Sequence, residues 1–198
     1  PAGPGQRAVG REGGDAVKKL SAKALRAKAA KARLVLTDID GVLTAGTIYH
    51  LVDTAGELVE FKGIHAQDSI AMAWLAESGL VTGVISGRVS KGTEARLKIL
   101  KVKHIYQHRL DKAAVLTEIL ASEKLSPDQV VYMGDDIPDL AVMNRVGLAV
   151  APANARPETA AAAHWVTKAG GGDGAFRELT EVILKSQGLW DAILAKYR

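Results

Sequence analysis

The 198-residue sequence has no cysteine, and aromatic residues make up only 5% of it. The lack of cysteine excludes disulfides, thiolate metal sites and a cysteine nucleophile, and it favours a reducing compartment such as the cytoplasm. No apolar run reaches the roughly 20 residues that a membrane-spanning helix needs, so we expect no membrane span. The hydrophobic content of 47% is nevertheless enough for one sizeable buried core.

Positive charge is concentrated near the N-terminus. Residues 1–33 hold nine Lys or Arg and two Asp or Glu, a net charge of +7, whereas the whole chain carries +4, which leaves −3 for residues 34–198. A basic segment without aromatic residues for base stacking is typical of a solvated tail, so we expect no nucleic-acid partner. We predict that 1–33 is an N-terminal extension, disordered over 1–14 and helical over 16–32, and that 34–198 is the folded domain.

Strand-like and helix-like segments alternate from Leu34 onward. Short apolar runs predict strands at 34–37, 80–85, 103–106, 130–133 and 147–150, with a weaker one at 164–167. Periodic segments predict helices near 66–78, 89–100, 112–123, 136–145, 156–163 and 174–197, the last of them broken at Gly188. Continuous apolar strands that alternate with helices indicate a three-layer, Rossmann-like α/β fold with a parallel sheet.

One segment interrupts this alternation directly after the first strand. Residues 46–62 contain two strand-like runs around the turn sequence DTAG, which predicts an inserted β-hairpin. No insertion is long enough to form a separate cap domain. We therefore expect a parallel sheet with a hairpin and without a cap.

Polar residues follow four consecutive strands at their predicted carboxyl ends, where an open parallel sheet binds its ligands. Asp38 and Asp40 follow the first strand, and alternate residues of an extended chain project to the same side, so both can face one site. Ser86 follows the second strand and Lys112 the third. An acidic cluster follows the fourth strand, with Asp135, Asp136 and Asp139.

This set of residues is suited to phosphoryl transfer. Two neighbouring carboxylates repel each other unless a cation lies between them, and Mg²⁺ prefers carboxylate, phosphate and water oxygens. One carboxylate can attack phosphorus to form an aspartyl-phosphate, while the other acts as general acid and then as general base. A hydroxyl and an ammonium group can hold the phosphoryl oxygens. Taken alone, D-x-D-G also fits an ordinary turn after a strand.

The motifs D-I-D-G-V-L-T, hydrophobic-Ser-Gly-Arg, Lys and G-D-D-x-x-D resemble those of phosphatases of the haloacid dehalogenase superfamily. The resemblance implies that Asp38 is the nucleophile and Asp40 the acid/base. It implies that Ser86 and Lys112 hold the phosphoryl group. The implied magnesium ligands are Asp38, the backbone carbonyl of Asp40, and Asp135, with Asp136 or Asp139 in support through water.

Residues 34–188 also resemble a narrower group, the capless phosphatases typified by 3-deoxy-D-manno-octulosonate 8-phosphate (KDO 8-phosphate) phosphatase. The segments that carry this resemblance are DIDGVLTAGTIY, GELVEF, SGR, HIYQ, YMGDDIPDLAVMNRVGLAVAPANA and AGGGDGAFRE. The resemblance implies hydrolysis of a sugar-acid phosphate, KDO 8-phosphate to KDO and phosphate, in lipopolysaccharide biosynthesis. It also implies a homotetramer in which the hairpin and a neighbour's tail help to close the site.

The implied substrate contacts are His65, Asp68, Ser69, Gly87, Arg88, Arg96 and Lys112. The run His65–Ser69 departs from the family's N-V-R-D-G: Asp68 is kept, but the arginine and the glycine are absent, and Ala73 stands where an arginine can occur. Because guanidinium groups recognise carboxylates, a related 2-keto-3-deoxy sugar acid phosphate is an alternative substrate. A receiver-like signalling domain is an alternative of another class, since it also places a phosphorylated Asp, a Ser or Thr and a Lys on a parallel sheet.

Overall fold

The computed structural model describes residues 19–198, so the segment predicted to be disordered at 1–14 lies outside the described residues. Six parallel strands form the central sheet in the order β5-β4-β1-β6-β7-β8. The strands are β1 (Leu34–Thr37), β4 (Val81–Ile85), β5 (His104–Tyr106), β6 (Val130–Met133), β7 (Leu148–Ala151) and β8 (Trp165–Val166). Each of these strands lies within one residue of its predicted bounds.

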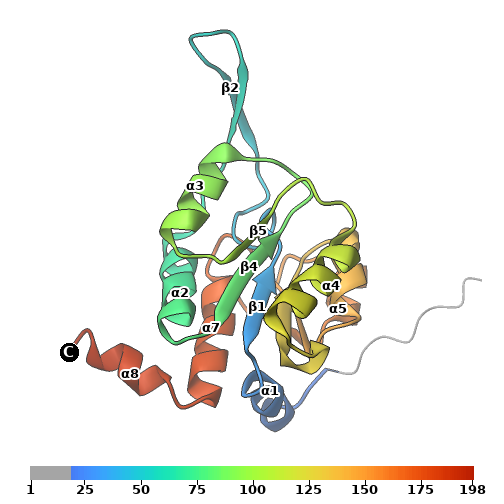
Figure 1. Cartoon of the computed structure of the whole chain (residues 1–198), viewed down its shortest axis with the longest axis vertical. Helices are drawn as coiled ribbons and strands as arrows, with labels where there is room; N and C mark the ends of the chain where they lie inside the picture. The colour runs from blue at the N-terminus through green and yellow to red at the C-terminus, as the bar shows by residue number, and fades with distance from the viewer. Residues whose placement is uncertain (1–18) are drawn as a thin grey trace, which may run out of the picture.

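Helices cover both faces of the sheet (Figure 1). They are α1 (Ala22–Ala29), α2 (Ala66–Glu77), α3 (Lys91–Ile99), α4 (Lys112–Glu123), α5 (Leu140–Met143), α6 (Pro157–Ala162), α7 (Ala175–Ser186) and α8 (Trp190–Ala195), with short 3₁₀ helices at Pro127–Gln129 and Ile137–Asp139. Successive residues of β1 face opposite cores: Val35 packs with α2 and α7, whereas Leu34 and Leu36 pack with α4 and α5. The predicted three-layer α/β fold is confirmed.

The predicted hairpin is also confirmed, and no cap covers the sheet in the described part of the chain. Strands β2 (Tyr49–Val52) and β3 (Leu58–Phe61) pair with each other alone and project from the body (Figure 1). Asp53 shapes the turn because its side chain accepts hydrogen bonds from two backbone N–H groups, of Ala55 and Glu57. The larger apolar side chains of the hairpin are exposed: Tyr49, Leu51, Val52, Leu58, Val59 and Phe61.

Helix α1, which falls within the segment predicted to be helical at 16–32, packs against the body. Ser21 caps its N-terminus, and Ala29 and Ala32 are buried in the core beside α7. The Lys28 ammonium donates to the carbonyl of Gly147 at 2.6 Å. The packed body therefore includes residues that precede Leu34.

The C-terminal segment divides at Gly188, as predicted, because this glycine adopts a φ of 69° between α7 and α8. Helix α8 then contacts α2: the rings of Trp190 and Trp74 pack edge to face, with 5.6 Å between their centroids. The Trp74 ring nitrogen donates to the Tyr197 hydroxyl at 3.0 Å. Among residues 19–198, no helix has both the length and the hydrophobicity to cross a membrane.

Candidate active site

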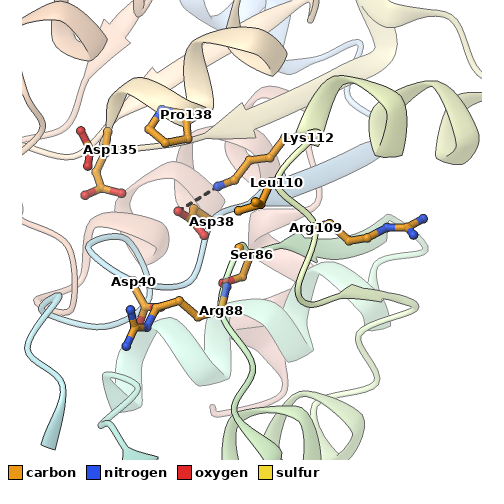
Figure 2. A pocket seen from close by; sticks show the side chains of 11 residues that line it. Asp38, Asp40, Ser86, Arg88, Arg109, Leu110, Lys112, Asp135 and Pro138 are labelled. Carbon is orange, nitrogen blue, oxygen red and sulfur yellow. Dashed lines mark hydrogen bonds and ion pairs between the residues drawn. The ribbon is translucent and has the colours of Figure 1, made fainter.

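A cavity of about 370 Å³ lies at the carboxyl ends of the central strands, the edge at which the sequence predicted a site (Figure 2). The loops after β1, β4 and β6 and the segment between β5 and α4 contribute to its wall. Its lining residues are Asp38, Asp40, Ser86, Gly87, Arg88, Arg109, Leu110, Lys112, Asp135, Asp136 and Pro138.

The loop after β1 carries Asp38 and Asp40 to the cavity. The backbone N–H of Asp38 donates to a β6 carbonyl at 3.0 Å, and Ile39 is buried, so the loop is anchored on both sides of Asp38. Gly41 then turns the chain with a φ of 87°, and a β-carbon at this position would lie 2.0 Å from an oxygen of Asp135. Only glycine fits between the two acidic loops.

Lys112 provides a fixed cation at the floor of the cavity. Its Nζ lies 2.9 Å from Asp38 Oδ2 and 2.7 Å from Asp139 Oδ1, and its side chain is only 4% exposed (Figure 2). Burial alone would lower the pKa of Lys112, but the Asp139 and Asp38 carboxylates outweigh burial and raise this pKa above its ordinary value. Lys112 is therefore positioned to stay charged beside Asp38.

Asp139 is fully buried beneath the acidic loop that follows β6, and its side chain holds this loop through hydrogen bonds. Its Oδ1 accepts from Lys112 and from the Tyr132 hydroxyl at 2.6 Å. Its Oδ2 accepts from the backbone N–H groups of Asp135 at 2.9 Å and Asp136 at 3.2 Å. Both oxygens of Asp139 are thus engaged within the protein, and this side chain fixes its neighbours in place.

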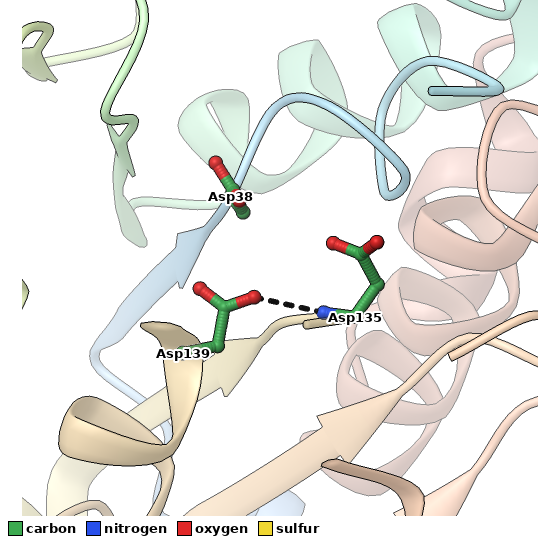
Figure 3. A group of neighbouring side chains, drawn as sticks. All are labelled: Asp38, Asp135 and Asp139. Atoms are coloured by element: carbon green, nitrogen blue, oxygen red, sulfur yellow. Dashed lines mark hydrogen bonds between the residues drawn. The ribbon is translucent and has the colours of Figure 1, made fainter. Parts of the chain in front are cut away.

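Asp38, Asp135 and Asp139 form a close acidic group (Figure 3), with one oxygen of each within 4.8 Å of the others. Burial raises the pKa of Asp38 to about 6, although Lys112 opposes the rise. Burial, with the charges of Asp139 and Asp38, raises the pKa of Asp135 to about 7. Asp135 Oδ1 is buried without a hydrogen-bond partner among the described residues. An unpartnered carboxylate oxygen in so crowded an acidic group fits a hard divalent cation.

The loop after β4 brings Ser86 and Arg88 to the opposite wall. The backbone N–H of Ser86 donates to the carbonyl of Tyr106 on β5 at 2.9 Å, and its Oγ accepts from the backbone N–H of Arg88 at 3.2 Å. The Arg88 guanidinium is about half exposed and pairs with Glu60 at 3.0 Å. The loop therefore presents an oriented hydroxyl inside the cavity and a cation beside Asp40 (Figure 2).

The other predicted substrate contacts do not line this cavity. They are His65, Asp68, Ser69 and Arg96. Arg96 is exposed on α3. Asp68 is buried, and its side chain accepts from the backbone N–H groups of Gly174 at 3.3 Å and Arg177 at 2.7 Å. Within one subunit, Asp68 therefore caps the N-terminus of α7 and lies outside the lining of the cavity.

Two side chains beside the aspartate loop were missed by the sequence patterns. Lys62, at the end of the hairpin, donates to both oxygens of Asp40, and no motif marks it. Asn154 donates to the carbonyl of Gly41 at 3.3 Å and accepts from the backbone N–H of Gly171 at 2.6 Å. A β-carbon on Gly171 would lie 1.7 Å from that same carbonyl, so the glycine-rich segment packs tightly against the loop.

Comparison with known proteins agrees with this geometry. The family model of haloacid dehalogenase-like hydrolases matches residues 81–179, and the chain belongs to this family. Its relatives include the 3-deoxy-D-manno-octulosonate 8-phosphate phosphatase KdsC of Yersinia pestis, which is 40% identical over 160 residues, covering 81% of this chain and 83% of the relative. KdsC of Escherichia coli strain K12 is 37% identical over 165 residues, which cover 83% of this chain and 86% of the relative. The chain is therefore a phosphatase.

One solved structure of a relative has the same fold as this chain and contains bound molecules. The 3-deoxy-D-manno-octulosonate 8-phosphate phosphatase of Moraxella catarrhalis superposes with a TM-score of 0.82 at 32% identity, covering 88% of this chain and 98% of its own. That protein was solved in complex with a magnesium ion, a phosphate ion and KDO. Membership of a hydrolase family excludes the receiver-like signalling domain that the strand-end residues alone left open.

Proposed function

We propose that this phosphatase hydrolyses KDO 8-phosphate to KDO and inorganic phosphate. The names of its relatives support this substrate, as does the KDO bound to the Moraxella catarrhalis protein. The observation that carries the proposal within this chain is the buried Lys112 ammonium, paired with Asp38 at the floor of a cavity that Ser86 and Asp40 also line. Because the run at 65–69 is altered, a related 2-keto-3-deoxy sugar acid phosphate is the alternative substrate.

In the proposed first step, a carboxylate oxygen of Asp38 attacks the phosphorus atom of the substrate. The bond from phosphorus to the sugar oxygen breaks, and Asp40 gives a proton to that leaving oxygen. Lys112, at 2.9 Å, and the backbone N–H of Ile39, at 2.6 Å, hold the Asp38 carboxylate for this attack. The products are an aspartyl-phosphate on Asp38 and the free sugar acid.

In the proposed second step, water attacks the aspartyl-phosphate and Asp40 takes its proton. The bond from phosphorus to the Asp38 oxygen breaks, which releases inorganic phosphate and restores the carboxylate. Ser86, the backbone of Gly87 and Lys112 line the space where the phosphoryl oxygens would lie, and they offer donors to the charge that develops there. Arg88, beside Asp40, is positioned to contact the sugar acid.

Magnesium is the proposed cofactor. Asp38, Asp135 and the backbone carbonyl of Asp40 would hold it, while Asp136 and Asp139 would support them. The bound ion supplies positive charge that offsets the repulsion between phosphate and carboxylates. The unpartnered Asp135 Oδ1 and the close acidic group in Figure 3 fit this role.

Removal of divalent metal is expected to abolish phosphate release. Without a divalent cation, no positive charge offsets the crowded carboxylates of Asp38 and Asp135, and these groups repel an incoming phosphate. The measurement is phosphate release after dialysis against EDTA, followed by addition of Mg²⁺, which we expect to restore activity. Unchanged activity in excess chelator after dialysis would contradict the metal proposal.

A substrate panel tests the proposed function. We expect kcat/KM for KDO 8-phosphate to exceed that for nine-carbon 2-keto-3-deoxy sugar acid phosphates and for simple sugar phosphates by about tenfold or more, a difference of about 1.4 kcal/mol in transition-state binding. Preference for a nine-carbon acid would select the alternative substrate. Preference for nucleotides or phospho-amino acids would remove the sugar-acid proposal altogether.

A homotetramer is the proposed assembly, and the cytoplasm the proposed location. The hairpin exposes apolar side chains on both of its strands, and a two-stranded hairpin alone is only marginally stable in water. Packing between copies of the chain would cover these side chains, among them the stacked rings of Tyr49 and Phe61. The hairpin would then lie where neighbouring subunits meet and help to close the site.

A further inference from the structure

The base of the hairpin reaches into the active site through one buried lysine. Lys62 directly follows β3, and its Nζ lies 2.8 Å and 2.9 Å from the two oxygens of Asp40. Its side chain is 1% exposed, although most of the hairpin is exposed. Two other polar side chains lie near this carboxylate: the Thr44 hydroxyl is 3.5 Å from Asp40 Oδ1, and Arg88 Nε is 4.0 Å from Asp40 Oδ2. Lys62 is thus the closest side-chain partner of Asp40 among the described residues.

Glu60, on β3 itself, balances the charge of Lys62. Its Oε1 lies 3.0 Å from Lys62 Nζ, and its Oε2 lies 3.0 Å from the Arg88 guanidinium. A buried ammonium is costly unless it is paired, so Glu60 and Asp40 together allow Lys62 to be buried. Lys62 and Glu60 also join the hairpin to two loops of the site. Lys62 contacts Asp40 in the loop after β1, and Glu60 contacts Arg88 in the loop after β4.

We propose that Lys62 is a positioning residue for the reaction: it holds the Asp40 carboxylate in the orientation from which this group exchanges a proton with the leaving oxygen and then with water. Glu60 keeps Lys62 in place from the same strand. This inference rests on the proposed function, because it assumes that Asp40 is the acid/base. It assigns to the hairpin a direct role in catalysis within its own subunit.

The physical reason is geometric. Proton transfer requires the carboxylate oxygen to lie within hydrogen-bond distance of the reacting oxygen, about 2.6–3.2 Å. A misplacement of about 1 Å can cost about a hundredfold in rate. A carboxylate held through both oxygens by one buried ammonium has a single orientation, whereas the same carboxylate without that partner can rotate. Lys62 contacts Asp40 and Glu60, so its loss is expected to affect kcat far more than substrate affinity.

The test is the variant Lys62→Met, which keeps the length of the side chain and removes the ammonium. We expect kcat on KDO 8-phosphate to fall by about tenfold to a hundredfold, with KM within about threefold of the wild type. Lys62→Arg should recover part of the loss because it restores a cation at the same place. The matched control is Lys31→Met. Lys31 lies just before β1, is exposed and pairs with Asp128, so its loss should leave kcat unchanged.

A double-mutant cycle separates positioning of Asp40 from a general effect on folding. In an Asp40→Asn background, Lys62→Met should lower the residual kcat by no more than about twofold, because the group it positions is already gone. Losses that multiply in the double variant would overturn the inference. If Lys62→Met does not fold, Lys62→Gln enters the same cycle, with thermal unfolding to show that it is folded.

The inference and the proposed function fail in different ways. Wild-type kcat in Lys62→Met, together with a large loss in Asp40→Asn, would overturn the role of Lys62 and leave the acid/base assignment intact. Wild-type kcat in Asp40→Asn itself would overturn the proposed mechanism on which the inference rests.

Discussion

Replacement of Asp38 by asparagine is expected to lower turnover by at least about 10⁴-fold, because the amide has nearly the shape of the carboxylate but is not a nucleophile. The side chain lies beside Lys112 at the cavity floor, whereas Asp139, the other carboxylate beside Lys112, is fully buried and does not line the cavity. The measurement is rapid quenching with radiolabelled substrate, which should trap phosphoprotein in the wild type and none in Asp38→Asn. Phosphate release in the steady state should fall in parallel.

The fold of Asp38→Asn should persist, since the change removes one negative charge from an acidic group that Lys112 only partly neutralises. Asp128→Asn is a suitable control because Asp128 is exposed and pairs with Lys31, away from the cavity. This control should keep wild-type turnover. Near-normal hydrolysis of a generic aryl phosphate by Asp38→Asn would show that the aspartyl-phosphate mechanism is wrong.

The central sheet was predictable because its strands are buried on both faces. Residues 34–37 and 130–133 read as continuous apolar runs, and every residue of β1 and β6 is buried. The hairpin was predictable from its turn, since the sequence DTAG supplies an aspartate that bonds the turn backbone and a glycine at a φ of 82°. Local sequence was sufficient in both cases.

Other elements depended on tertiary contacts. A continuous helix was predicted over 136–145, but the chain forms a 3₁₀ turn at Ile137–Asp139 before α5, because Asp139 turns inward to bond Lys112 and the backbone of the acidic loop. Helix α1 has a weak apolar stripe, and its burial depends on the surface that α7 offers. Neither outcome follows from periodicity.

The residues of the candidate site also fall into two groups, those that local sequence predicts and those that depend on tertiary contacts. Asp38, Ser86, Lys112 and Asp135 were predictable because parallel strands bring their carboxyl ends to one edge, whatever the rest of the chain does. Asp68 and Arg96 were inferred from motif position alone, and the structure turns Asp68 toward the N-terminus of α7 and leaves Arg96 exposed on α3. Lys62 belongs to no motif, because it reaches Asp40 only where the chain returns from the projecting hairpin to the loop after β1.

Removal of the ammonium of Lys112 is expected to cost both stability and activity. Lys112 is 4% exposed and Asp139 is fully buried, and the two are 2.7 Å apart. Loss of one partner of a buried ion pair leaves the other as an uncompensated charge, which typically costs about 3–5 kcal/mol of unfolding free energy. In Lys112→Met, Asp139 would keep the Tyr132 hydroxyl and two backbone N–H donors but no cation, and Asp38 would lose its partner as well.

The measurement for Lys112→Met is urea unfolding in the absence of Mg²⁺, so that metal binding does not contribute to the free energy. Lys98→Met is the matched control because Lys98 forms an exposed ion pair with Glu94 on α3, and loss of an exposed pair changes stability by about 0–1 kcal/mol. Phosphate release by Lys112→Met should also fall, because in the proposed mechanism the same ammonium holds the attacking carboxylate and faces the phosphoryl oxygens. A loss below about 1 kcal/mol would contradict the role of Lys112 as the charge that allows Asp139 to be buried, since no other lysine or arginine lies within ion-pair distance of Asp139 in the described part of the chain.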